Sequence, residues 1–202
     1  METRFQVRSF DSPLTPEAFS RIPRCPLFVV LDNLRSAFNV GSIIRTADCT
    51  LAERIYFCGI TAHPPNTKLD KTALGALSYL PWEHRNTVEE PIVHLKENGI
   101  PVVALETTDK SRVIWEYQFP LPVGLVLGNE ALGVSQAALR LVDDVVEIPM
   151  LGYKNSINVA VAFGIAAYEI QRQYWNRLAR NRQLKNQIER DTPRSSTLAG
   201  AV

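Results

Sequence analysis

The chain has 202 residues, of which 46% are hydrophobic, 21% charged and 8% aromatic, and its formal net charge is +1. This length suits one domain, and the composition excludes wholesale disorder, collagen-like repeats and a coiled-coil rod. The longest nearly apolar stretch, residues 157–168, is shorter than the ~20 residues of a membrane span, and the N-terminus has no apolar signal core. The three cysteines (Cys25, Cys49 and Cys58) lack CxxC spacing and a nearby histidine pair. We therefore expect a cytoplasmic protein with no membrane contact, disulfide framework or metal site.

Short β-rich apolar runs alternate with segments of helical periodicity. The predicted strands are 27–31, 54–60, 101–107, 122–127 and 144–150, and the predicted helices are 40–50, 72–80, 88–98, 135–142 and a final long helix starting near Ser156. Residues 63–70, which are polar and proline-rich, are predicted to form a surface loop. The strands lack strict alternation, which is typical of strands buried on both faces of a parallel sheet. The sequence therefore predicts an α/β fold with a mostly parallel sheet flanked by helices, and a ligand site at the carboxyl ends of the strands.

The loop after the strand at 27–31 carries the first candidate residues. Asn39 is predicted to cap the following helix, which places Arg45 in the first half of that helix. Arg45 either pairs with a surface carboxylate, Asp32 or Asp48, or lies beside a helix N-terminus, where a phosphate or a developing oxyanion is stabilised.

The loop after the strand at 122–127 places Gly128 and Gly133 around Glu130. Glycine permits close backbone approach to a ligand, and the glutamate can accept a hydrogen bond from an amine, a hydroxyl or an arginine. The alternative is an ordinary glycine-rich turn with an exposed glutamate. The spacing does not match the GxGxxG of a dinucleotide-binding loop, which disfavours a nucleotide-dependent oxidoreductase.

The loop after the strand at 144–150 leads into an alanine- and glycine-rich helix. Ser156 is predicted to cap this helix, and the small residues predict close packing in the core or against a second subunit. Asn158 would lie within an otherwise apolar helix, where an unpaired amide costs roughly 1–3 kcal/mol. We therefore expect Asn158 to bond to a ligand or to a network between loops.

The C-terminal segment is basic. Residues 171–194 contain seven lysines and arginines against two acidic residues, a net charge of +5. Such a segment is either a solvated surface helix or an arm that contacts a polyanion. Beyond about Arg182 the helical pattern weakens, so we expect a frayed tail.

Taken together, the three loops resemble the three motifs of the SpoU-type RNA 2′-O-methyltransferases of the SPOUT superfamily. The first motif is Asn39-x-Gly41-x-x-x-Arg45-Thr46-Ala47 and the second is Gly128-Asn129-Glu130-x-x-Gly133. The third is Ile148-Pro149-Met150 followed by Ser156-Ile157-Asn158-Val159-Ala160. The segment 71–76 also resembles a family segment, and the resemblance spans residues 27–170.

The resemblance implies an α/β domain with a C-terminal deep trefoil knot, assembled as a homodimer, with S-adenosylmethionine as cofactor. It implies an N-terminal extension at 1–26, the methyltransferase domain at 27–170 and a basic C-terminal helical extension with a frayed tail at 171–202. The cofactor would be held largely through backbone groups. The implied cofactor-binding residues are Leu105, Glu106, Thr107, Gly128, Asn129, Ile148, Met150, Ser156, Ile157 and Asn158.

The implied reaction is methyl transfer to a ribose 2′-hydroxyl of tRNA or rRNA, with no metal. The implied catalytic residues are Arg45, Asn39, Glu130, Ser156 and Asn158. A guanidinium is a weak base near neutral pH, so Arg45 is either deprotonated transiently beside a phosphate or stabilises the forming alkoxide as a cation. The expected RNA contacts are Arg45, Arg172, Arg177, Arg180, Arg182 and Lys185. The alternative function is a non-catalytic knotted RNA-binding or assembly factor.

Overall fold

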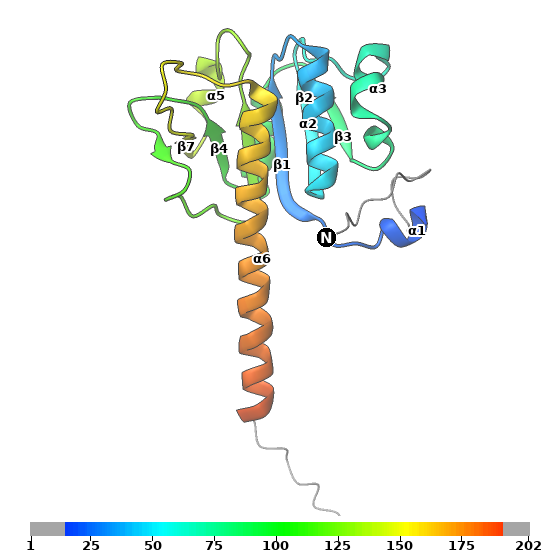
Figure 1. The fold of residues 1–202 in the computed structure, drawn as a ribbon, viewed down its shortest axis with the longest axis vertical. Helices are drawn as coiled ribbons and strands as arrows, with labels where there is room; N and C mark the ends of the chain where they lie inside the picture. The colour runs from blue at the N-terminus through cyan, green and yellow to red at the C-terminus, as the bar shows by residue number, and fades with distance from the viewer. Residues whose placement is uncertain (1–14, 192–202) are drawn as a thin grey trace, which may run out of the picture.

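The computed structural model describes residues 15–191, without the side chains of Pro16 and of residues 184–191. Within this range seven strands form one sheet in the order β3-β2-β1-β6-β4-β7-β5, and every neighbouring pair is parallel (Figure 1). The strands are β1 (Cys25–Asp32), β2 (Ala52–Cys58), β3 (Trp82–Arg85), β4 (Val102–Leu105), β5 (Arg112–Val113), β6 (Val123–Leu127) and β7 (Asp144–Glu147). The predicted parallel sheet is confirmed. Because all strands share one direction, the loops after them meet at a single edge.

Helices cover both faces of the sheet. They are α1 (Pro16–Phe19), α2 (Ala37–Cys49), α3 (Thr67–Ala73), α4 (Glu89–Glu97), α5 (Gln136–Leu139) and α6 (Val159–Asp191), together with a 3₁₀ turn at Ala76–Ser78. Buried residues of α2, α3 and α6 form one hydrophobic core with the sheet, and those of α4 and α5 form a second. The molecule is therefore a three-layer α/β sandwich.

The central strands explain the continuous apolar runs of the sequence. In β1, Val29 and Leu31 pack in the core under α2 and α6, whereas Val30 packs in the core under α4. All three side chains are fully buried. Since alternate residues of a strand face opposite sides, a strand covered on both sides must be apolar at every position.

The region after β2 differs from the prediction. The helix predicted at 72–80 is wrong, because α3 begins at Thr67, inside the predicted loop 63–70, with the Asn66 side chain accepting from two backbone N–H groups as its cap. It ends where Leu74 and Gly75 take positive φ angles of 48° and 85°. The short strands β3 and β5 were not predicted, because β3 carries three charged or ionisable residues and β5 has only two residues.

The C-terminal helix α6 is longer than predicted. It runs without interruption through residue 170 and past Arg182 to Asp191, so fraying does not begin at Arg182; residues 192–202, like 1–14, lie outside the described residues. At 1.5 Å per residue the helix is about 50 Å long, and its C-terminal half extends beyond the α/β body (Figure 1). Neither α6 nor any other helix within residues 15–191 is long and apolar enough to cross a membrane.

Candidate active site

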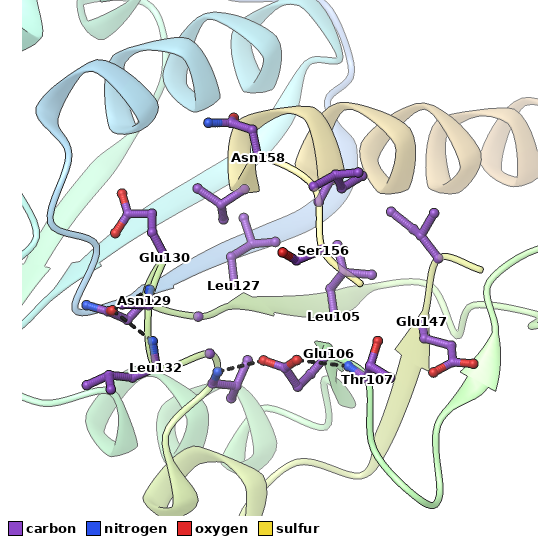
Figure 2. Close-up of a pocket in the computed structure, with 18 of the residues that line it drawn as sticks. Leu105, Glu106, Thr107, Leu127, Asn129, Glu130, Leu132, Glu147, Ser156 and Asn158 are labelled. Atoms are coloured by element: carbon purple, nitrogen blue, oxygen red, sulfur yellow. Dashed lines mark hydrogen bonds between the residues drawn. The ribbon is translucent and has the colours of Figure 1, made fainter. Parts of the chain in front are cut away.

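A cavity of about 880 Å³ lies at the carboxyl ends of β4, β6 and β7, next to the start of α6 (Figure 2). Three chain segments form most of its wall, namely 105–108, 127–134 and 147–159. All ten residues predicted to bind a cofactor line this cavity. A smaller hollow of about 270 Å³ adjoins it and shares part of its wall, including Thr107 and Met150.

The loop after β6 is tightly folded against itself. Asn129 and Gly133 exchange two backbone hydrogen bonds of 2.9 and 2.8 Å, and Gly133 has a φ of +70°. A Cβ on Gly128 would lie 2.1 Å from backbone atoms of Gly133 and Val134. Only glycine at 128 allows this close approach, so the loop requires glycine at this position and is not an ordinary glycine-rich turn.

The Glu106 carboxylate joins two walls of the cavity. One oxygen accepts from the Val134 backbone N–H at 2.9 Å and the other accepts from the Thr107 N–H at 2.9 Å (Figure 2). The loop after β4 is thereby tied to the loop after β6 through a charged side chain.

Residues from the three predicted motifs form one hydrogen-bond chain. The Glu130 carboxylate accepts from the Arg35 N–H (2.8 Å), the Ser36 N–H (3.0 Å) and the Asn39 Nδ2 (2.9 Å). The Asn158 amide donates in turn to Asn39 Oδ1 at 3.0 Å. The sequence predicts that Asn158 bonds to a ligand or to a network between loops, and the structure shows such a network among Asn39, Glu130 and Asn158.

The same chain affects the ionisation of Glu130. Loss of solvent raises the pKa of its carboxyl, but the hydrogen bonds from Arg35, Asn39 and Ser36 outweigh this, so the pKa lies below its ordinary value. The carboxylate is therefore ionised at neutral pH. The hydrogen bonds to ionised Glu130 stabilise the folded loops. Because the folded-state pKa is depressed, this stabilisation is fully present above the unfolded-state pKa and is lost as the pH falls through the folded-state pKa.

Two predicted helix caps are wrong. The cap of α2 is Ser36, whose side chain accepts from the Asn39 N–H at 3.3 Å, so Asn39 lies inside the first turn with its amide free to face Glu130. The cap of α6 is Asn158 instead of Ser156, because Asn158 Oδ1 accepts from the N–H groups of Ala160 and Val161. Ser156 lines the cavity.

Arg45 differs from the other predicted catalytic residues, all of which line the cavity. It is exposed on α2, and it is absent from the residues that line the cavity of its own chain. Asp32 is 1% exposed, and its oxygens accept from the Asn33 side chain and the Ser135 N–H. Asp32 therefore holds the loops at the sheet edge and does not serve as the partner of Arg45.

The basic residues of α6 are in different environments. Arg172 is bonded through Nε and Nη2 to Glu169 at 2.8 and 2.7 Å, and this pairing holds the pKa of the Glu169 carboxyl below its usual range. Arg177 contacts the Phe119 carbonyl at 3.4 Å. Arg180 and Arg182 are exposed, and the side chain of Lys185 lies outside the described residues.

Sequence reasoning missed Glu147, the last residue of β7. Its carboxylate accepts from the Ser111 hydroxyl at 2.6 Å, and the residue lines both the cavity and the adjoining hollow. Its position at the carboxyl end of a parallel strand was the signal that could have identified it. Gln136, in α5, and Asn155, in the loop after β7, also line the cavity and were missed.

Comparisons with known proteins match this fold and these motifs. The chain is 30% identical over 150 residues to the tRNA (guanosine(18)-2'-O)-methyltransferase of Escherichia coli K12, covering 74% of this chain and 65% of that protein. It is 31% identical over 147 residues to the Thermus thermophilus protein of the same name, covering 73% and 75%. The structure of the SpoU methyltransferase AviRb from Streptomyces viridochromogenes in complex with AdoMet superposes with a TM-score of 0.70 at 29% identity, covering 77% of this chain and 63% of that one.

A parallel α/β sheet with this cavity and these three motifs defines a SpoU-type methyltransferase domain. The chain belongs to the SpoU rRNA Methylase family, whose model matches residues 26–168. It spans 60 to 65% of the length of the first curated relatives that it matches.

Proposed function

We propose that the protein transfers a methyl group from S-adenosylmethionine to a ribose 2′-hydroxyl of tRNA or rRNA. The observation that carries this proposal is the convergence of the three motifs on one cavity, linked by the chain Glu130–Asn39–Asn158. Family membership and a relative named as a tRNA 2'-O-methyltransferase support the same reaction class.

The cavity fits S-adenosylmethionine in size and chemistry. Its volume lies within the ~300–1,000 Å³ range of small-molecule sites. Apolar walls from Leu105, Leu127 and Ile157 suit an adenine ring, while Ser156, Asn158 and the loop backbones offer polar groups. The AdoMet-bound relative supports this assignment.

Cofactor binding without RNA tests the proposal. Because the cavity is built from loops of one continuous domain, we expect calorimetry to detect S-adenosylmethionine binding to the isolated protein and competition by S-adenosylhomocysteine. Absence of heat and of competition would remove the methyltransferase assignment.

Each candidate catalytic residue would have its own role in the reaction. When bound, S-adenosylmethionine supplies an electrophilic methyl group. The protein must then align the 2′-hydroxyl with that group and stabilise the loss of its proton. We assign proton removal or alkoxide stabilisation to Arg45, orientation of the ribose or arginine to Asn39, and order in the cavity wall to Ser156 and Asn158. Glu130 would hold the loop before α2 through its three hydrogen bonds.

We further propose a homodimer whose two subunits share each active site. Three large side chains repeat every seven residues along α6 and remain about half exposed: Val161 (55%), Tyr168 (53%) and Trp175 (53%). Phe38 on α2 is 61% exposed and lies two turns before Arg45. A second copy covering these faces would remove the apolar surface from water, and Arg45 could then reach the partner's cavity.

A mixed-dimer experiment tests this arrangement. Gly128→Ala should abolish cofactor binding, because its Cβ would lie 2.1 Å from the backbone of Gly133 and Val134, while Arg45→Ala removes the arginine and leaves the cavity intact. Each variant alone should be inactive. In co-expressed heterodimers, one of the two sites would combine an intact cavity with an intact Arg45, and we expect activity to return to about half that of wild type. Heterodimers that stay inactive would place Arg45 and the cavity of one chain in the same site.

The exposed part of α6 is proposed as an RNA contact. Arg177, Arg180 and Arg182 are exposed on the C-terminal half of α6, and cations on an exposed helix attract phosphates. Arg172 is left out of the test because its removal would also deprive Glu169 of its ion-pair partner.

Replacing Arg177, Arg180 and Arg182 with glutamine should weaken RNA binding and reduce the slope of affinity against salt by about 3. Affinity for S-adenosylmethionine should not change. Arg21→Gln is the control, because Arg21 is exposed and lies far from α6 in the sequence. An unchanged salt slope in the triple variant would make this part of α6 a solvated helix.

We also propose that the C-terminal part of the domain forms a trefoil knot. Strand β7 lies between β4 and β5 although β5 precedes it in the chain, so β7 is inserted between two strands of the earlier segment from β4 through β5 to β6. The chain after β7 then returns to α6, which packs against α2 and β1. This order supports threading of the C-terminal part through that segment. The division into 1–26, 27–170 and 171–202 and the cytoplasmic location remain predictions.

A further inference from the structure

The cavity wall carries an unbalanced negative charge. Three glutamates line it, Glu106, Glu130 and Glu147, and within the described residues no lysine, arginine or histidine does so. Lys154 lines only the adjoining hollow, where it is exposed. Within one chain, a ligand that fills the cavity therefore meets carboxylates without a basic residue in the same wall.

Two of these carboxylates are available to act on the ligand. Glu130 is occupied by hydrogen bonds from Arg35, Ser36 and Asn39, which lie at the start of α2. Glu106 accepts one N–H on each oxygen from the two cavity loops, and each oxygen has a second lone-pair direction (Figure 2). Glu147 accepts from Ser111 through one oxygen.

We propose that Glu106 and Glu147 select the cationic cofactor over its neutral product. This inference rests on the proposed function. S-adenosylmethionine has a sulfonium, an ammonium and a carboxylate, a net charge of +1, whereas S-adenosylhomocysteine is a net-neutral zwitterion. Transfer forms a carbon–oxygen bond to the methyl group and breaks its carbon–sulfur bond, whose electron pair stays on sulfur and leaves a neutral thioether. The hydroxyl proton passes to Arg45 or to water. Attraction to the two carboxylates is therefore stronger before the reaction than after it, and favours exchange of product for fresh cofactor.

The two glutamates are specificity-determining residues in this account. Glu106 also has a structural role, since its hydrogen bonds tie the loops after β4 and β6 together. Loosening of those loops would weaken every ligand of the cavity alike. A charge effect, in contrast, would weaken cationic ligands selectively, so the ratio of two dissociation constants separates the two roles.

The test measures dissociation constants of three ligands by calorimetry: S-adenosylmethionine, S-adenosylhomocysteine and sinefungin, whose amine gives a cation near the sulfonium position. The proteins are wild type, Glu106→Gln, Glu147→Gln, the double variant and the exposed control Glu116→Gln. We expect the double variant to lower the preference for S-adenosylmethionine over S-adenosylhomocysteine at least ~10-fold, which corresponds to about 1.4 kcal/mol. The affinity for sinefungin should fall with that for S-adenosylmethionine. Glu147→Gln alone should lower the preference by a smaller factor, and Glu116→Gln should leave it unchanged.

The outcomes distinguish this inference from the proposed function. If wild type binds S-adenosylmethionine and the double variant keeps the wild-type ratio within ~2-fold, the charge selection is wrong and the methyltransferase assignment stands. If all three ligands weaken equally, Glu106 acts only through the loops, and the inference is again overturned. If wild type binds none of the three ligands, the proposed function fails and this inference fails with it.

Discussion

Replacing Arg45 with alanine should reduce methyl transfer by at least ~100-fold, the scale of one lost acid-base or transition-state group. Arg45 is exposed on α2 and lines no part of its own chain's cavity, so its removal should leave the fold and the cofactor affinity unchanged. Single-turnover transfer to RNA, thermal unfolding and calorimetry with S-adenosylmethionine measure these three properties separately.

Arg45→Lys separates the two chemical roles open to this residue. Lysine keeps the positive charge but loses the planar fork and has a lower pKa. Partial recovery that grows with pH would favour proton removal, and no recovery would favour positioning by the guanidinium. Near-normal transfer by Arg45→Ala would contradict the catalytic assignment while leaving the family assignment intact.

Gly128→Ala should abolish measurable cofactor binding. The added Cβ would lie 2.1 Å from the backbone of Gly133 and Val134, so the loop after β6 must move away from the cavity wall. Such overpacking typically costs about 1–3 kcal/mol, so the variant should also unfold at a lower temperature. Calorimetry and thermal unfolding measure the two effects.

Gly152→Ala is the matched control, because a Cβ at Gly152 meets no atom within 4 Å although this residue lines the adjoining hollow. It should bind S-adenosylmethionine like wild type. Wild-type affinity in Gly128→Ala would show that close packing of the loop after β6 is not needed for the cofactor.

The sheet and the cavity wall could be predicted because their signals are local. The buried strand β1 is apolar at successive positions, and glycine and polar residues follow β6 directly. The ten predicted cavity residues come from such strand ends and from motif resemblance. Strand direction brings the loops to one edge, so periodicity predicts the edge where a ligand binds, and the resemblance to the family supplies the residues.

The remaining features depend on contacts between distant segments. Asn39 faces Glu130 because Ser36 caps α2 three residues earlier, and serine and asparagine are both common cap residues. Asn158 takes the cap of α6 while its amide reaches Asn39, a pairing across 119 positions. The position of Arg45 relative to the cavity could not be predicted from the sequence either, because it depends on how α2 is oriented and not on spacing within the motif.

One measurement tests the central claim most directly. The purified protein is incubated with tRNA and rRNA from cells lacking it and with methyl-labelled S-adenosylmethionine, and the RNA is digested to nucleosides and analysed by mass spectrometry. We predict that label appears as a 2′-O-methylated nucleoside at a defined position, and that Arg45→Ala lacks this product. Label on a base, or RNA binding with no label transferred, would contradict the account, and the latter result would favour a non-catalytic RNA-binding or assembly factor.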